Sequence, residues 1–245
     1  MPTGILRQVK RALLERWLMP VSPVEQVPYC IYRRYRVNNP ITIIDIGAHQ
    51  GDFTLGLKKV CPISNAVLIE PISRLAESLR ANPEFSGYSV FDCVIAAHDG
   101  EIEFNVFPDA PFTSSALSAD FTVEGMTSAT KTGAEVVRRP ARTLDSVIAQ
   151  TGLKLIDLIK IDVQGLEHLV IQGATDVLAR TTAVFTEVSF RPLYVRSSVF
   201  NDIYRMMYER GFVLTALEPG FRTPSGELLQ ADALFVRHAH LQQSA

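Results

Sequence analysis

The sequence predicts an α/β fold in which helices cover both faces of a mostly parallel sheet, and three observations support this class. Apolar runs of strand length alternate with segments of helical period along most of the 245 residues, which is typical of right-handed strand–helix–strand units. The 47% hydrophobic and 20% charged fractions are those of a globular protein with one sizeable core. No internal repeat or second boundary interrupts residues 41–245, so residues 1–40 are expected to form a helical cap on one domain.

The first half of this domain predicts three strands and two helices. The strands are expected at "ITIIDI" (41–46), "AVLIE" (66–70) and "YSVFDCVIA" (88–96). The helices are expected at 52–60 and 73–81, the second with Ser73 as its N-cap.

A less regular region follows. "EIEFNVF" (101–107) alternates like an exposed hairpin arm. Residues 108–135 are rich in Ser, Thr, Ala and Gly without a clear period, and a loop this long in a compact domain is often a lid or a binding loop. Within it, "TSSALS" (113–118) is either part of a pocket or plain loop.

Regular elements return after residue 142. Helices are expected at 143–150, with Thr143 or Asp145 near the start, at 166–179, and at 197–211, where Gly211 ends the helix. Strands are expected at 155–163, 182–188, 212–217 and 231–238. Because no helix separates the last two strands, they predict an antiparallel terminal hairpin.

The amino terminus is not a secretory signal, because charges interrupt its apolar positions. Residues 5–18 have helical spacing with basic residues between, which fits a membrane-surface helix or, as we favour, a lid or dimer helix. No apolar run approaches the roughly 20 residues of a membrane span. Three widely spaced cysteines and a net charge of −2 favour a reducing, cytoplasmic setting and disfavour a nucleic-acid partner.

A glycine turn follows the first expected strand. Asp45, Gly47 and Gly51 give the spacing D-x-G-x-x-x-G, at the strand end where open α/β sheets bind ligands. The dinucleotide pattern G-x-G-x-x-G is absent. An acid before the first glycine suits a positively charged ligand better than a pyrophosphate, so the turn favours S-adenosylmethionine (SAM) over NAD.

Glu70 ends the second expected strand, 25 residues after Asp45. A carboxylate there can accept both hydroxyl groups of an adenosine ribose, in SAM or in NAD. The alternatives are a solvated strand-end acid for Asp45 and a partner of the next helix dipole for Glu70.

These motifs resemble the FkbM-type class I methyltransferases, which depend on SAM. The resemblance covers about residues 41–237 and is carried by "IDIGAHQGDFT", "LIEPISRL", "RTLDSVI", "LIDLIKIDVQGLEHLVIQGATDVL" and "FTEV". It implies a Rossmann-like sheet of seven strands with the last strand antiparallel. It also implies SAM contacts from Asp45, Gly47, Ala48, Gly51 and Glu70, with Asp92, Cys93 and Val94 near the adenine.

Two positions depart from the family pattern. His49 stands where such proteins more often have Asn, and Gln164 where they more often have Glu. The second change removes a carboxylate, which puts a divalent metal at this site in doubt.

Methyl transfer to a hydroxyl group requires alignment of the acceptor and a destination for its proton. Lys160 and Asp162 lie two apart on one face of a strand, and they are either a buried structural ion pair or catalytic groups. Glu187 ends the next strand and would face the same cleft, or else is a surface acid. His49 is a candidate base, although a bond to the loop backbone is the alternative.

The resemblance therefore implies O-methylation of a small molecule or sugar. The sequence leaves the oligomeric state open, with a homodimer as one alternative. A non-catalytic SAM-binding or scaffold protein is one alternative, and an NAD-dependent oxidoreductase is a weaker one. A nucleic-acid amino-methyltransferase is disfavoured, since the chain has no [DNS]-P-P-[YFW] motif and no basic surplus.

Overall fold

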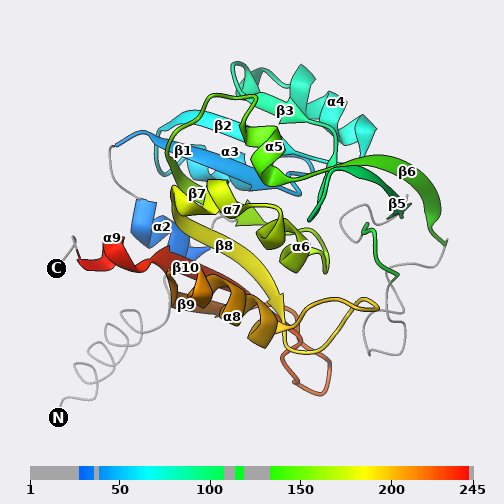
Figure 1. The fold of residues 1–245 in the computed structure, drawn as a ribbon. Helices are drawn as coiled ribbons and strands as arrows, with labels where there is room; N and C mark the ends of the chain where they lie inside the picture. The colour runs from blue at the N-terminus through cyan, green and yellow to red at the C-terminus, as the bar shows by residue number, and fades with distance from the viewer. Residues whose placement is uncertain (1–27, 36–38, 108–113, 119–132, 243–245) are drawn as a thin grey trace, which may run out of the picture.

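The computed structural model describes residues 28–35, 39–107, 114–118 and 133–242. Its main feature is a seven-stranded sheet with the order β3-β2-β1-β7-β8-β10-β9, whose strands follow one another from top to bottom in Figure 1, behind the helices of one face. The strands are β1 (Ile41–Ile46), β2 (Ile63–Ile69), β3 (Ser89–Phe91), β7 (Ile156–Ile161), β8 (Thr181–Ser189), β9 (Phe212–Pro219) and β10 (Gln230–Arg237).

The directions of these strands confirm the predicted class I arrangement. β1 is central and pairs in parallel with both β2 and β7, and β7 pairs in parallel with β8. The last strand, β10, runs antiparallel to β8 on one side and to β9 on the other. The expected terminal hairpin of β9 and β10 is therefore present. The carboxyl ends of β1, β2 and β7 consequently meet at one edge of the sheet.

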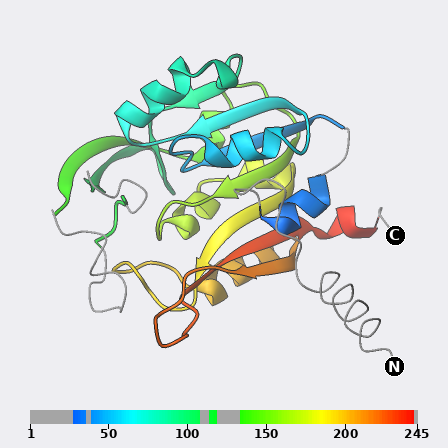
Figure 2. The same ribbon diagram turned by 180° about the vertical axis from the view of Figure 1, so that it is seen from behind.

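Helices cover both faces, as expected from strands that are apolar on both sides. One face packs against α5 (Leu144–Ile148), α6 (Glu167–Gln172), α7 (Thr175–Ala179) and α8 (Phe200–Glu209). The other face packs against α2 (Tyr29–Tyr35), α3 (Asp52–Lys58) and the end of α4 (Ser73–Ala81). Figure 2, from behind, shows α2 and α3 on this second face.

A second, three-stranded sheet has the order β4-β6-β5 and was not expected. Its strands are β4 (Val94–Ile95), β5 (Gly100–Val106) and β6 (Glu135–Arg142). The prediction of one strand over 88–96 was wrong, because this segment divides at Asp92 and Cys93 between the two sheets. The expected hairpin arm is β5, and it forms a full antiparallel ladder with β6, a strand that was not predicted from the sequence.

Several local predictions also needed correction. The helix expected over 166–179 is two helices, α6 and α7, which are separated at Gly173 and Ala174. Ser73 is the first residue of α4 and not its cap, since Ile72 occupies the cap position and makes no side-chain bond there. Thr143, by contrast, caps α5 by accepting a hydrogen bond from the Ser146 N–H. Two short elements, the helix η1 (Pro83–Phe85) and α9 (His238–Gln242), were not predicted.

The helix expected over residues 5–18 lies outside the described residues, so the division at residue 40 stays a prediction. Within the described part of residues 1–40, Ile31 and Tyr35 of α2 are buried in the core on the second face. Over the described ranges, none of the helices has both the length and the apolar character needed to cross a lipid bilayer.

Candidate active site

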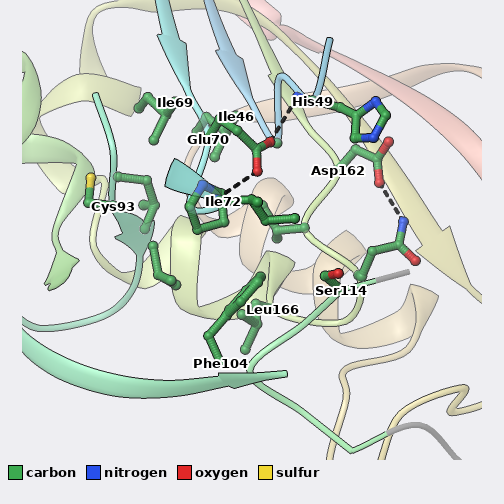
Figure 3. Close-up of a pocket in the computed structure, with 16 residues that line it drawn as sticks. Ile46, His49, Ile69, Glu70, Ile72, Cys93, Phe104, Ser114, Asp162 and Leu166 are labelled. Carbon is green, nitrogen blue, oxygen red and sulfur yellow. Dashed lines mark hydrogen bonds between the residues drawn. The ribbon is translucent and has the colours of Figure 1, made fainter. Parts of the chain in front are cut away.

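A pocket opens at the carboxyl edge of β1, β2 and β7 and encloses about 590 Å³, counting the part that is open to solvent. Figure 3 shows His49 and Asp162 at one end of the pocket, Cys93 at the other, and Glu70 between them. Of the residues predicted for the site, six line this pocket: Gly47, His49, Glu70, Cys93, Val94 and Asp162.

The glycine turn forms one wall, and its shape depends on close backbone approach. The N–H groups of Gly47 and Ala48 both donate to the Ile69 carbonyl, at 2.9 and 3.1 Å. Gly47 has a φ of 74°, and a Cβ there would lie 1.9 Å from the Asp162 carbonyl oxygen. No other residue type can occupy this position without moving the β7 end. Gly51, at φ 83°, similarly begins α3 against the Phe85 ring.

Glu70 lies in the pocket wall with its carboxylate fixed by the backbone. Its Oε2 accepts from the His49 N–H at 2.8 Å, and its Oε1 accepts from the Ile72 N–H at 2.9 Å. Burial raises the Glu70 pKa, and these two amide bonds oppose that shift. Because Ile72 is the N-cap of α4, Glu70 does serve the helix start. A carboxylate has about four acceptor sites, so others are left for a ligand.

The far end of the pocket is apolar and contains residues that the sequence reading missed. Ile72, Phe104 and Leu166 pack with Val94 in one cluster and line the pocket. Phe104 comes from β5, so the small sheet contributes this part of the wall. Its alternation with exposed neighbours was the available signal, but it did not say what β5 covers.

Asp92 does not line the pocket, although it was expected near the adenine. Its carboxylate is paired with Arg139 of β6, which also donates to the Ser73 hydroxyl. The hydrogen bond from Arg139 to Ser73 therefore joins the small sheet to the start of α4. Cys93 remains at the pocket wall, where burial raises its thiol pKa to about 11.

Beneath the turn lies a row of three charges. Asp45 is fully buried, accepts a hydrogen bond from the Thr54 hydroxyl at 2.7 Å, and does not line the pocket. The Lys160 ammonium lies 3.5 Å from both Asp45 Oδ1 and Asp162 Oδ2, and donates to the Gly47 carbonyl at 2.7 Å. Burial lowers the Lys160 pKa, but the two carboxylates outweigh it and raise the pKa overall. Lys160 thus supports the turn and Asp162 from below.

His49 has a left-handed backbone, φ 50°, and its side chain lies next to Asp162 (Figure 3). Burial lowers the pKa of its imidazole. Its Nε2 is buried and has no hydrogen-bond partner among the described residues. A neutral ring with an unpaired nitrogen at a pocket wall is able to accept a proton from a ligand.

Glu187 lies outside the pocket lining, half-buried, and its carboxyl accepts from Gln230 at 2.5 Å. Burial, with Asp162 and Glu167 as further causes, raises its pKa well above the usual value. Asp232 lies opposite it on β10, and burial raises the Asp232 pKa to about 7. Glu167 of α6 is buried as well, and burial raises its pKa to about 7. None of these three groups lines the pocket, and the Asp162 carboxylate contributes to the raised pKa of each.

The segment Ser114–Ser118 brings part of the expected binding loop to this site. Ser114 lines the pocket, and the fully buried Ser115 forms an isolated bridge to Asn105 of β5. Residues 108–113 and 119–132 of that loop lie outside the described residues. In the described part of the chain, no group of three or more His, Cys, Asp or Glu side chains is arranged to hold a metal ion.

A family model and two curated relatives are similar to this chain. The family model described as "Methyltransferase FkbM domain" matches residues 45–214. The 2-O-methyltransferase NoeI of Sinorhizobium fredii is 27% identical over 162 residues, which cover 62% of this chain and 65% of NoeI. This chain therefore spans less than two thirds of NoeI. Methyltransferase sdnD of Sordaria araneosa is 25% identical over 203 residues, 73% of this chain and 75% of that protein.

Among solved structures, TrmK of M. capricolum in complex with S-adenosyl-homocysteine (SAH) aligns with a TM-score of 0.45 and 10% identity. The alignment covers 85% of this chain and 66% of that one.

Proposed function

The chain belongs to the FkbM methyltransferase domain family, and from that premise we propose that it transfers the methyl group of SAM to a hydroxyl group of a small molecule or sugar. Members of this family are SAM-dependent methyltransferases, and the name of one relative, 2-O-methyltransferase NoeI, supports a hydroxyl acceptor. The observation that carries the proposal is Glu70, whose carboxylate is held by two backbone amides at the wall of a pocket.

The pocket residues fit SAM on three counts. Glu70 has acceptor sites left for the ribose hydroxyl groups. The apolar end formed by Ile72, Val94 and Leu166 suits an adenine ring. The glycine turn at the other end lets the backbone approach a ligand closely.

Bound SAM would supply a methyl carbon attached to a sulfonium, and this carbon is the electrophile. The chain's own part is to align the acceptor and take its proton. We propose His49 as the proton acceptor, because its imidazole has a lowered pKa and an unpaired Nε2. Asp162 would orient the acceptor hydroxyl, with Lys160 as a positioning residue beneath it. The carboxyl groups of Glu187, Asp232 and Glu167 would contribute to the electrostatic potential around Asp162.

The test is a calorimetric titration of the protein with SAM, SAH and NAD, each with and without magnesium. Micromolar binding of SAM or SAH, without measurable binding of NAD, supports the proposal and justifies an acceptor screen. Binding of NAD without measurable binding of SAM overturns it. SAM binding without methyl transfer to any acceptor pool would favour a non-catalytic SAM-binding protein.

Glu70→Ala should weaken SAM binding by about 10- to 100-fold, since hydrogen bonds to a charged group contribute about 1.5–3 kcal/mol. It should also lower the stability of the fold, because the N–H groups of His49 and Ile72 lose their acceptor. Titration calorimetry and urea unfolding measure the two effects. Glu77→Ala, an exposed acid on the same helix α4, is the control. An unchanged SAM affinity in Glu70→Ala would rule out the ribose role.

Asp162→Asn should reduce turnover far more than SAM binding. Asparagine keeps an oxygen that can accept the hydrogen bond from Gln164, whereas the negative charge is lost. We expect turnover with an acceptor from the screen to fall by about 10²-fold, the scale of one acid–base group. The SAM dissociation constant should change by less than about threefold. Equal losses in both quantities would instead assign Asp162 to the cofactor.

A further inference from the structure

The loop between β7 and α6 contains a strained residue to which the proposed reaction gives no role. Gln164 has a φ of 54°, in the left-handed region that residues with a Cβ rarely adopt. It lies in the pocket wall and is half-buried. Strain of this kind persists only where the surrounding contacts hold it, and it gathers at functional sites.

The side chain of Gln164 is bonded at both ends of its amide. Its Nε2 donates to Asp162 Oδ1 at 2.8 Å, which is the dashed line at Asp162 in Figure 3. Its Oε1 accepts from the Tyr194 hydroxyl at 2.8 Å. Because a carboxylate can only accept, the amide nitrogen must be the end that faces Asp162. The amide therefore has one orientation, and it links the ends of β7 and β8.

The backbone of Gln164 is held as well. Its carbonyl accepts from the Ser115 hydroxyl at 2.7 Å, and Ser115 is fully buried. Ser115 is in turn bridged to Asn105 of β5 through both backbone groups, at 2.8 and 3.1 Å. The left-handed turn is thus fixed from the small sheet, independently of the side-chain amide.

These contacts act on a carboxylate that would otherwise be free to rotate. The Asp162 side chain is 39% exposed. Besides the Gln164 amide at Oδ1, the Lys160 ammonium lies 3.5 Å from its other oxygen, Oδ2. The amide on one oxygen and the ammonium near the other define a single orientation. We propose that Gln164 is a positioning residue that fixes the Asp162 carboxylate at the pocket wall and ties it to Tyr194. The contact stands by itself, while its use in catalysis rests on the proposed function.

A negative charge introduced at residue 164 distinguishes a positioning role toward Asp162 from a purely structural role in the loop. In Gln164→Glu, the Tyr194 hydroxyl still has an acceptor, but a second carboxylate faces Asp162. Two carboxyl groups at this distance share a proton, so the pair has a raised pKa in the folded state. The groups that face Asp162 from the surrounding elements also contribute: Lys160, His49, Glu167, Glu187, Tyr194 and Asp232. Comparison with the wild type at each pH removes their common effect.

The direction of the pH effect follows from linkage. A carboxyl pair whose folded-state pKa lies above its unfolded value does not destabilise the protein at low pH, where the pair is protonated. The protein loses stability as the pH rises through the folded-state pKa. The unfolding midpoint of Gln164→Glu should therefore fall further below that of the wild type between pH 5 and pH 8. We call the difference between the unfolding midpoints of the wild type and a variant the gap, and for Gln164→Glu we expect the gap to widen by roughly 3–8 °C. The control is Gln164→Asn, which suits a left-handed backbone but is one methylene short and stays neutral.

The measurement is thermal unfolding of the three full-length proteins over that pH range, beside calorimetric titration of the wild type with SAM. A widening gap for Gln164→Glu with a constant gap for Gln164→Asn supports the inference, as does a Gln164→Glu protein that folds only at the acid end. A gap that stays constant for Gln164→Glu overturns it. If the gap widens but the wild type does not bind SAM, the proposed function fails while the orientation of Asp162 by Gln164 is retained.

Discussion

Gly47→Ala should reduce SAM binding by about 10²-fold or more, which is the scale that a displacement of roughly 1 Å produces at a site. The added Cβ would lie 1.9 Å from the Asp162 carbonyl oxygen, and the φ of 74° adds strain for any residue with a side chain. Relief of the clash must move either the turn that carries His49 or the β7 end that carries Asp162. Titration calorimetry with SAM measures the loss.

The chain offers a matched control for this prediction. Gly87 has a similar φ of 87°, but a Cβ there meets no atom within 4 Å. Gly87→Ala should show the cost of the left-handed backbone alone, about 1–2 kcal/mol of stability, with SAM affinity unchanged. If Gly47→Ala binds SAM within threefold of the wild type, the turn does not form the cofactor wall.

Lys160→Met should lower the free energy of unfolding by about 3–5 kcal/mol, the usual result of removing one partner from a buried ion pair. Methionine retains most of the apolar stem but removes the ammonium. Asp45 is fully buried, and among the described residues it then keeps only Thr54 as its hydrogen-bond partner. The carbonyl of Gly47 also loses its donor. Urea unfolding at pH 7 measures the change.

Two further variants test whether charge is the cause. The double variant Asp45→Asn with Lys160→Met should recover part of the loss, because no uncompensated charge is then buried beneath the turn. Lys59→Met, at an exposed position just after α3, should change stability by no more than about 0.5 kcal/mol. A double variant less stable than the sum of the two single changes would contradict the buried-pair explanation.

The main sheet was largely predictable because most of its strands are short, mainly apolar segments, as in "ITIIDI" and "LIDLIKI". The small sheet was not, because β6 contains Pro140 and adjacent arginines, which argue against a strand. In the structure, β4 pairs only with Ala141 and Arg142, so Pro140 stands where β6 has no partner on that side. Asp92, at the point of division, pairs with Arg139 of β6, and no local pattern contains that contact.

The sequence predicted which strand ends form the candidate site, but it predicted the contacts of the individual side chains less well. Gly47, Glu70 and Asp162 follow from strand-end position, and all three line the pocket. Asp45 also ends a strand, but its alternation places it toward the core beneath the turn, where Lys160 pairs with it. The role of Gln164 was inaccessible, since it depends on Tyr194, which is 30 residues away.

The central position of β1 has a consequence for the order in which the protein forms during synthesis. β1 pairs with β7, whose residues leave the ribosome more than 100 positions later. Until then one edge of β1 is open, Asp45 lacks its cation, and the glycine turn lacks its support from Lys160. Non-local pairing of this kind slows folding and leaves apolar strand edges exposed in the meantime. The nascent chain up to β6 therefore carries the glycine signature without a working pocket, and it is the form most exposed to aggregation.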